Sequence, residues 1–199
     1  MAGLIRLGIA IALAFTLLPW AAAVFMETWI GRPRWLPQQD PWWVVGGLAL
    51  AVPLVLWKRP NALVHTAIHE LCHAILCLVL LVRVTSFRVT DGQGGAVGHE
   101  RVDPLRGTII SLAPYTLPLL LLPLLVTRMY ITDPGYLRGA LSAGVAFFYI
   151  HHLHALYFNI RINMWGSQAD LVKSGRPLSA VVIASVLLLV TTWVLRVLA

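Results

Sequence analysis

Six apolar runs, separated by short polar or charged stretches, set the strongest limit on how this 199-residue chain can fold. Hydrophobic residues make up 59% of the sequence and charged residues only 12%, which is typical of membrane proteins and unusual for a soluble domain. A helix needs about 20 apolar residues to cross a bilayer. The runs cover residues 7–26, 42–57, 62–82, 107–127, 139–158 and 178–198. They predict an α-helical integral membrane protein with about six transmembrane helices.

The formal net charge is +7, and the basic residues lie mainly in the breaks between the apolar runs. Lys and Arg in such positions are typical of membrane flanks, whereas a nucleic-acid-binding face would interleave basic with aromatic side chains. We therefore expect the lipid bilayer as a partner, and no nucleic acid. We expect a multi-pass protein of the plasma (inner) membrane of a prokaryote, and its oligomeric state is left open.

The third run carries the polar sequence His69-Glu70-Leu71-Cys72-His73. In a helix, residues i and i+4 lie one turn apart on the same face, so His69 and His73 could bind one metal ion. The pattern His-Glu-x-x-His is typical of zinc sites in which the glutamate, here Glu70, is the general base. Ionisable side chains are costly inside a bilayer and usually have a function there. The other interpretation is that both imidazoles are core side chains that hydrogen-bond to neighbouring helices.

A catalytic zinc usually has three protein ligands and one open position for water, so the two histidines need a third ligand. Asp170, just before the last apolar run, is our first choice. The same aspartate also fits a helix capping box that begins at Ser167. His151 and His154 in the fifth run are the alternative ligands, because imidazole binds zinc equally well. The prediction is one Zn²⁺ per chain.

Residues 84–100, between the third and fourth runs, differ from the rest of the chain. Residues 84–90 are rich in β-branched side chains, 91–95 are a glycine-rich turn cluster, and 96–100 could return as a second strand. We therefore predict a small β-hairpin between the third and fourth transmembrane helices. It is either a simple connection or an open sheet edge that binds an extended peptide by strand addition.

Two further features concern the ends and the interior of the predicted helices. Asn61 comes directly before the third run and is expected to cap its helix. The fourth run contains three prolines, which free backbone carbonyls. Such prolines are tolerated where the backbone is buried in protein or lines a wet cavity. The three are Pro114, Pro118 and Pro123.

Together these features resemble the site-2-type intramembrane zinc metalloproteases. The resemblance covers roughly residues 60–175 and rests on the His-Glu-x-x-His motif in a span, the strand–turn–strand after it, the proline-rich run and the late Asp170. It implies that His69, His73 and Asp170 hold zinc and that Glu70 is the general base. It also implies that the substrate is a membrane helix, which unfolds locally and lies along the hairpin edge before cleavage.

On this interpretation, Val97 in the hairpin and Asn159 or Asn163 at the end of the fifth run are expected to hold the substrate. The chain departs from the family at Cys72, where the family usually has glycine, and at Leu171, where the family has the glycine of an Asp-Gly motif. We interpret residues 1–199 as a single multi-span membrane domain. It would contain two accessory spans in 1–60, a metalloprotease-like core in 61–176 and a terminal span in 177–199.

Two other functions stay open on the sequence. The chain could be a catalytically inactive metal-binding scaffold or transporter, in which the motif has lost its activity. It could also be a membrane di-iron oxygenase, because its clustered histidines superficially resemble that class's histidine boxes. Such sites need about eight imidazoles, however, and the chain has seven histidines in all.

Overall fold

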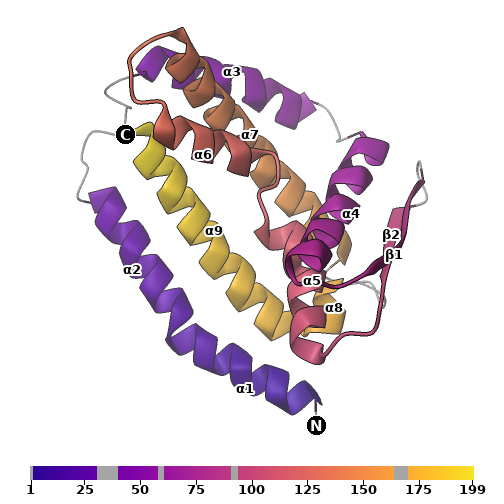
Figure 1. The fold of residues 1–199 in the computed structure, drawn as a ribbon. Helices are drawn as coiled ribbons and strands as arrows, with labels where there is room; N and C mark the ends of the chain where they lie inside the picture. The colour runs from indigo at the N-terminus through magenta and orange to yellow at the C-terminus, as the bar shows by residue number, and fades with distance from the viewer. Residues whose placement is uncertain (1, 31–39, 58–60, 91–93, 164–169) are drawn as a thin grey trace. The chain divides into compact units, whose positions relative to one another are not determined.

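The computed structural model describes residues 2–30, 40–57, 61–90, 94–163 and 170–199, and it is about 80% helical (Figure 1). The helices are α1 (Ala2–Phe15), α2 (Leu17–Ile30), α3 (Pro41–Trp57), α4 (Ala62–Val79), α5 (Pro104–Thr116), α6 (Leu121–Tyr130), α7 (Tyr136–Asn163), α8 (Asp170–Ser174) and α9 (Arg176–Leu198). The strands β1 (Val84–Thr90) and β2 (Gly94–His99) form a two-stranded antiparallel sheet. This sheet confirms the hairpin predicted between the third and fourth apolar runs.

Among the described residues, three helical stretches are long and apolar enough to cross a membrane. They are Gly3–Ile30, which joins α1 and α2, Ala62–Val79 and Arg176–Leu198. A fourth exists if α5 and α6, which are bent at their break, make one span together. The count of six stays a prediction, because the apolar part of α3 is the shorter stretch Pro41–Pro53 and α7 carries three histidines and two arginines.

Contacts divide the chain into two compact units, each built from three separate stretches. The first unit comprises residues 1–11, 59–117 and 155–183, and the second comprises residues 12–58, 118–154 and 184–199. The boundary therefore falls inside α1, α7 and α9. The sequence predicted a different division, into the consecutive segments 1–60, 61–176 and 177–199, and that division stays a prediction.

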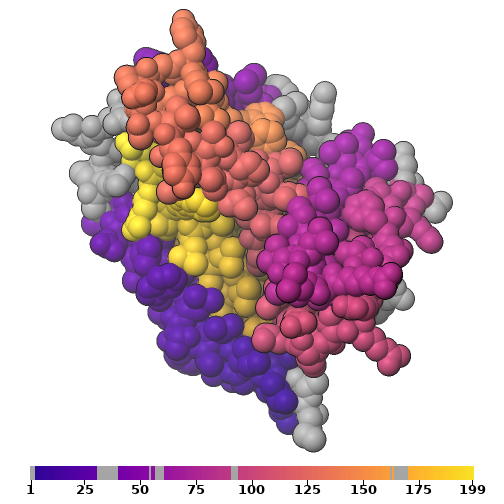
Figure 2. Space-filling view, viewed as in Figure 1, coloured from indigo at the N-terminus to yellow at the C-terminus, as the bar shows by residue number. Residues whose placement is uncertain are grey.

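In the first unit, α4 packs against both strands of the hairpin and against α5, and α5 packs against α8. The atoms of residues 62–90 and 94–116 accordingly lie next to one another in the space-filling view (Figure 2). Asn61 Oδ1 accepts a hydrogen bond from the backbone N–H of Val64 at 3.1 Å, so Asn61 caps α4 as predicted. Cys77, Val82 and Ile110 are the buried centre of an apolar cluster, against which Val84 of β1 also packs.

α4 is shorter than the apolar run that predicted it. The run extends to residue 82, but the helix ends at Val79 because a turn at Leu80 and Leu81 redirects the chain into β1. Leu81 adopts a left-handed backbone conformation, with φ of 56°. The backbone N–H of Val82 then donates to the carbonyl of Cys77 at 2.7 Å, which satisfies one of the last helical carbonyls.

The hairpin pairs Phe87 with Val97 and Val84 with His99, with an irregularity in β1 between Val84 and Ser86. β2 begins at Gly94, two residues earlier than the sequence predicted, and residues 91–93 of the turn lie outside the described residues. Within the part of the chain that the structure describes, the edge of β2 opposite β1 has no strand beside it.

In the second unit, side chains from α6, α7 and α9 form an apolar core of Leu121, Leu125, Val145, Val190 and Val194. A cluster of buried polar side chains lies near the start of α3. Asp40 Oδ2 accepts hydrogen bonds from Arg128 Nη2 at 3.3 Å, Arg138 Nε at 3.0 Å and Ser142 Oγ at 3.1 Å. One carboxylate thus links the start of α3 to the end of α6 and the start of α7.

α3 and α7 also approach each other closely at Gly47. A Cβ atom at Gly47 would lie 2.2 Å from the carbonyl oxygen of Ala143, a distance that no side chain could occupy without moving the backbone. Its neighbour Gly46 is open, because nothing lies within 4 Å of the corresponding position.

These two adjacent glycines give a matched pair of variants. We expect Gly47→Ala to destabilise the protein by about 1–3 kcal/mol, because α3 and α7 must separate to accommodate the methyl group. Gly46→Ala should be neutral or stabilising by up to about 1 kcal/mol, because alanine favours helix over glycine. The measurement is the thermal unfolding midpoint of each variant in detergent. Equal midpoints for the two variants would contradict the close packing of α3 on α7.

Candidate metal centre

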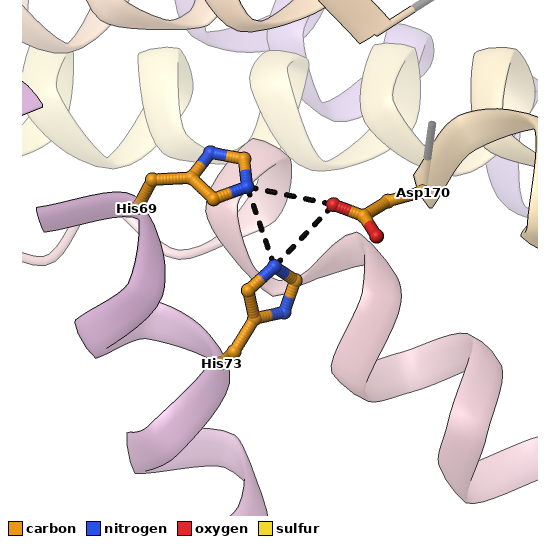
Figure 3. A group of neighbouring side chains, drawn as sticks. All are labelled: His69, His73 and Asp170. Atoms are coloured by element: carbon orange, nitrogen blue, oxygen red, sulfur yellow. Dashed lines mark hydrogen bonds and ion pairs between the residues drawn. The ribbon is translucent and has the colours of Figure 1, made fainter. Parts of the chain in front are cut away.

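Three side chains from α4 and α8 point their polar atoms at one another (Figure 3). His69 Nε2 and His73 Nε2 are 3.3 Å apart, and Asp170 Oδ2 lies 3.4 Å from each of these nitrogens. Ligands placed tetrahedrally around zinc at 2.0–2.2 Å are separated by about 3.3–3.6 Å, whereas strong hydrogen bonds between charged partners are about 2.7–2.9 Å long. The spacings therefore fit metal ligands. Among the described residues, these three side chains form a group that could hold a metal ion.

His73 is oriented by a backbone carbonyl that a proline leaves free. Its Nδ1 lies 2.7 Å from the carbonyl oxygen of Ile110 in α5, so the Nδ1–H donates to that oxygen and the Nε2 lone pair faces the site. In a regular helix the Ile110 carbonyl would accept the N–H of residue 114. That residue is Pro114, which lies inside α5 and has no N–H. The proline thus leaves an acceptor for the imidazole.

His69 is oriented by a side chain of α7. Its Nδ1 lies 3.1 Å from Oδ1 of Asn159, and the same oxygen lies 2.9 Å from Nε2 of His65, one turn earlier on α4. The ring of His69 also packs edge-on against Tyr115 of α5, with ring centroids 5.9 Å apart. With its Nδ1 facing Asn159, His69 presents Nε2 to Asp170.

Asp170 is the first residue of the short helix α8, which packs on α5. Its Oδ2 faces the two histidines, while its Oδ1 lies 3.7 Å from Nζ of Lys173. Burial raises the pKa of Asp170, but in the metal-free site the two imidazoles next to its Oδ2 outweigh burial and hold the pKa well below its usual range. The carboxylate is therefore ionised at neutral pH, as a metal ligand must be. Ser167 of the alternative capping box lies outside the described residues.

Glu70 lies beside His69, about 100° further round the helix, and its carboxylate is covered by β2. The carboxylate accepts a hydrogen bond from the backbone N–H of Val97. A Cβ atom at Gly95 would lie 2.5 Å from Cγ of Glu70 and 2.9 Å from its Oε1. The absence of a side chain at Gly95 therefore allows β2 to lie directly against this carboxylate.

These side chains line one open cavity of about 970 Å³ in the first unit. Its walls come from α1, α4, β2, α5, α8 and the end of α7. α1 contributes Arg6, whose guanidinium donates to the backbone carbonyl of Lys173. Because Glu70 and the metal-binding group all line this open cavity, water can reach them even though α4 is apolar enough for a membrane.

The residues predicted to hold a substrate also line the cavity. Val97 lies in β2, and Asn159 and Asn163 lie at the end of α7. Asn163 Nδ2 donates to the backbone oxygen of Asn159 at 3.1 Å, and the side-chain oxygen of Asn159 is engaged by His65 and His69. Their binding of a substrate stays a prediction.

The alternative ligands His151 and His154 belong to the second unit and are not part of the metal-binding group. Ile110 and Asn159, the partners that orient the ligands, were not predicted from the sequence in this role. Pro114 was the available signal for the first, because a proline inside a helix implies a carbonyl without its usual partner. Nothing in the spacing of Asn159 indicated that it would meet α4.

No family model, curated protein or solved structure matches this chain. The resemblance to a family of metalloproteases therefore stays a prediction from the sequence.

Removing any of the three side chains should reduce metal binding. We expect His69→Ala, His73→Ala and Asp170→Ala each to lose most of the metal that co-purifies with the wild-type protein, because two ligands hold an ion far less tightly than three. Metal per chain is measured by plasma mass spectrometry after purification. His99→Ala is the matched control, because His99 lines the same cavity but is outside the group. Full metal content in all three variants would exclude this centre.

Proposed function

We propose that this chain is an intramembrane zinc metalloendopeptidase of the site-2 type. It would hydrolyse a peptide bond in or near a transmembrane segment of a membrane-protein substrate. The observation that carries the proposal is the group of His69, His73 and Asp170 at metal-ligand spacings, with Glu70 beside it in the same cavity. We also propose a six-span arrangement, with α3 and α7 as the additional spans, in the plasma membrane of a prokaryote.

Zinc is the metal that this donor set suits best. Two imidazoles and one carboxylate with an open fourth position are a recurring set in hydrolytic zinc enzymes. When bound, the ion would lower the pKa of a water molecule from 15.7 to about 7 and polarise the scissile carbonyl. The imidazoles fit this role because each has its Nδ1 engaged and presents Nε2.

Glu70 supplies the proton transfers. One of its carboxylate oxygens takes the proton of the attacking water and later gives it to the nitrogen of the leaving amine. The backbone N–H of Val97 holds the carboxylate at the cavity wall while it does so. Arg6 and Lys173 also line this cavity and bring positive charge to it.

The hairpin explains how a helical substrate could be cleaved. The peptide carbonyls of an intact helix are hydrogen-bonded within the helix, so the substrate has to unfold locally before water can attack. The outer edge of β2 would stabilise the extended segment by strand addition. Val97 lies on this strand next to Glu70, so a segment paired there would pass the metal centre.

Glu70→Gln tests the proposal directly. We expect this variant to retain its zinc, because Glu70 is not in the metal-binding group, and to lose at least 10²-fold in cleavage rate, because the amide cannot accept the proton. Wild type and variant are expressed separately in the same host strain, and new N-termini in membrane proteins are quantified by mass spectrometry. Zinc per chain is measured on both purified proteins.

The two principal interpretations give different results in this experiment. New N-termini that appear with the wild type and not with Glu70→Gln support the peptidase. Identical N-terminal profiles with zinc present in both proteins would overturn the peptidase and favour a metal-binding scaffold or transporter. Two irons per chain in place of one zinc would favour the di-iron oxygenase.

A further inference from the structure

The side-chain amide of Asn159 is buried and hydrogen-bonded at both ends, whereas an amide that binds substrate needs a free polar atom. Its side chain is only 6% exposed, and its Oδ1 faces Nδ1 of His69 and Nε2 of His65. Its Nδ2 lies 3.4 Å from the carbonyl oxygen of Pro114. Because a carbonyl can only accept, the amide nitrogen must face Pro114, and the amide oxygen must therefore face the two imidazoles. This settles which end of the amide meets the histidines.

The orientation of the amide determines which nitrogen of His69 carries the proton. A neutral imidazole has one N–H and one lone pair. An oxygen that can only accept lies 3.1 Å from Nδ1, so the proton is stabilised on Nδ1 and the lone pair is on Nε2, which lies beside Asp170.

We propose that Asn159 is a positioning residue for the metal, which fixes His69 as an Nε2 ligand and acts without contacting the ion. The inference rests on the metal-binding part of the proposed function. It assigns to Asn159 a role different from the substrate contact that the sequence predicted.

The backbone of α5 supports this role. α5 ends at Thr116, and residue 118, which would donate to the Pro114 carbonyl in a continuing helix, is itself a proline without an N–H. The carbonyls of Ile110 and Pro114, one helical turn apart, are therefore both free of helical partners. The first accepts directly from His73, and the second accepts from Asn159, which in turn accepts from His69. One helix end thus orients both imidazoles.

The test compares variants of Asn159 by their affinity for Zn²⁺, measured on the full chain in detergent by competition with a chelator. Asn159→Leu keeps the volume and removes the acceptor, so its dissociation constant should rise 10- to 100-fold. Asn159→Asp restores an acceptor facing His69, so its affinity should return to within about threefold of the wild type. Asn163→Ala is the matched control and should bind Zn²⁺ as the wild type does, because the hydrogen bond described for Asn163 goes to the backbone oxygen of Asn159 and not to an imidazole.

Thermal unfolding of the metal-free proteins separates a role in metal binding from a role in folding. If Asn159→Leu does not fold, Asn159→Ala replaces it as the variant without an acceptor. Zn²⁺ affinity within twofold of the wild type in a folded variant without the acceptor would overturn the inference. Equal weakening in the leucine and aspartate variants would also overturn it, because the acceptor would then not be the cause.

This experiment and the Glu70→Gln experiment can fail independently. Unchanged Zn²⁺ affinity in Asn159→Leu, together with cleavage by the wild type, would remove the role of Asn159 and leave the peptidase. Affinity that depends on Asn159, together with identical N-terminal profiles, would remove the peptidase and leave the role of Asn159.

Discussion

The Nδ1–H groups of His69 and His73 need acceptors inside a unit whose packing is mostly apolar, and the rest of the site depends on how this need is met. A buried donor without a partner costs about 1–3 kcal/mol. The end of α5 meets the need because prolines at 114 and 118 leave two carbonyls without helical donors. The carbonyl of Ile110 accepts from His73 directly, whereas the carbonyl of Pro114 accepts from Asn159, which in turn accepts from His69. Both Nε2 atoms face Asp170.

The hairpin has a corresponding function for Glu70. A carboxylate in a helix that is apolar enough to span a membrane needs a hydrogen-bond donor or water. β2 provides the backbone N–H of Val97, and Gly95 allows the strand to come close enough to do so. The open cavity supplies water to the same wall. A backbone edge, an acidic side chain and a metal-binding group thus meet in one place, and the proposed peptidase would use all three.

The second unit satisfies its buried charges in a different way. Asp40 accepts hydrogen bonds from Arg128, Arg138 and Ser142 through a single oxygen, so two guanidinium groups share one carboxylate. The carbonyls of Ile131 and Thr132 accept further hydrogen bonds from the same arginines. Charge pairing here joins the ends of helices, whereas in the first unit hydrogen bonds to freed carbonyls orient single side chains.

Local sequence determined the features that depend on neighbouring residues. The spacing of His69 and His73 was sufficient to place both on one face, since residues i and i+4 of any helix share a face. The cap at Asn61 and the strand–turn–strand after α4 were also predicted correctly, because caps and turns depend on residues that are close in the sequence. The end of α4 was predicted three residues too late, because apolar composition does not distinguish a helix from the leucine-containing turn at Leu80 and Leu81, although Leu81 is exposed.

Only the tertiary structure decided which distant groups meet these local elements. Asp170 was one of three candidates for the third ligand that the sequence left open. It lies beside the two histidines because α8 packs on α5, which packs on α4. Asn159 was recognised as a polar residue at a helix end, but its contact with His69 depends on how α7 approaches α4. The physical reason is that intrahelical geometry is fixed by backbone hydrogen bonds between residues four apart, whereas the packing of one helix on another is fixed by side chains spread along the whole chain.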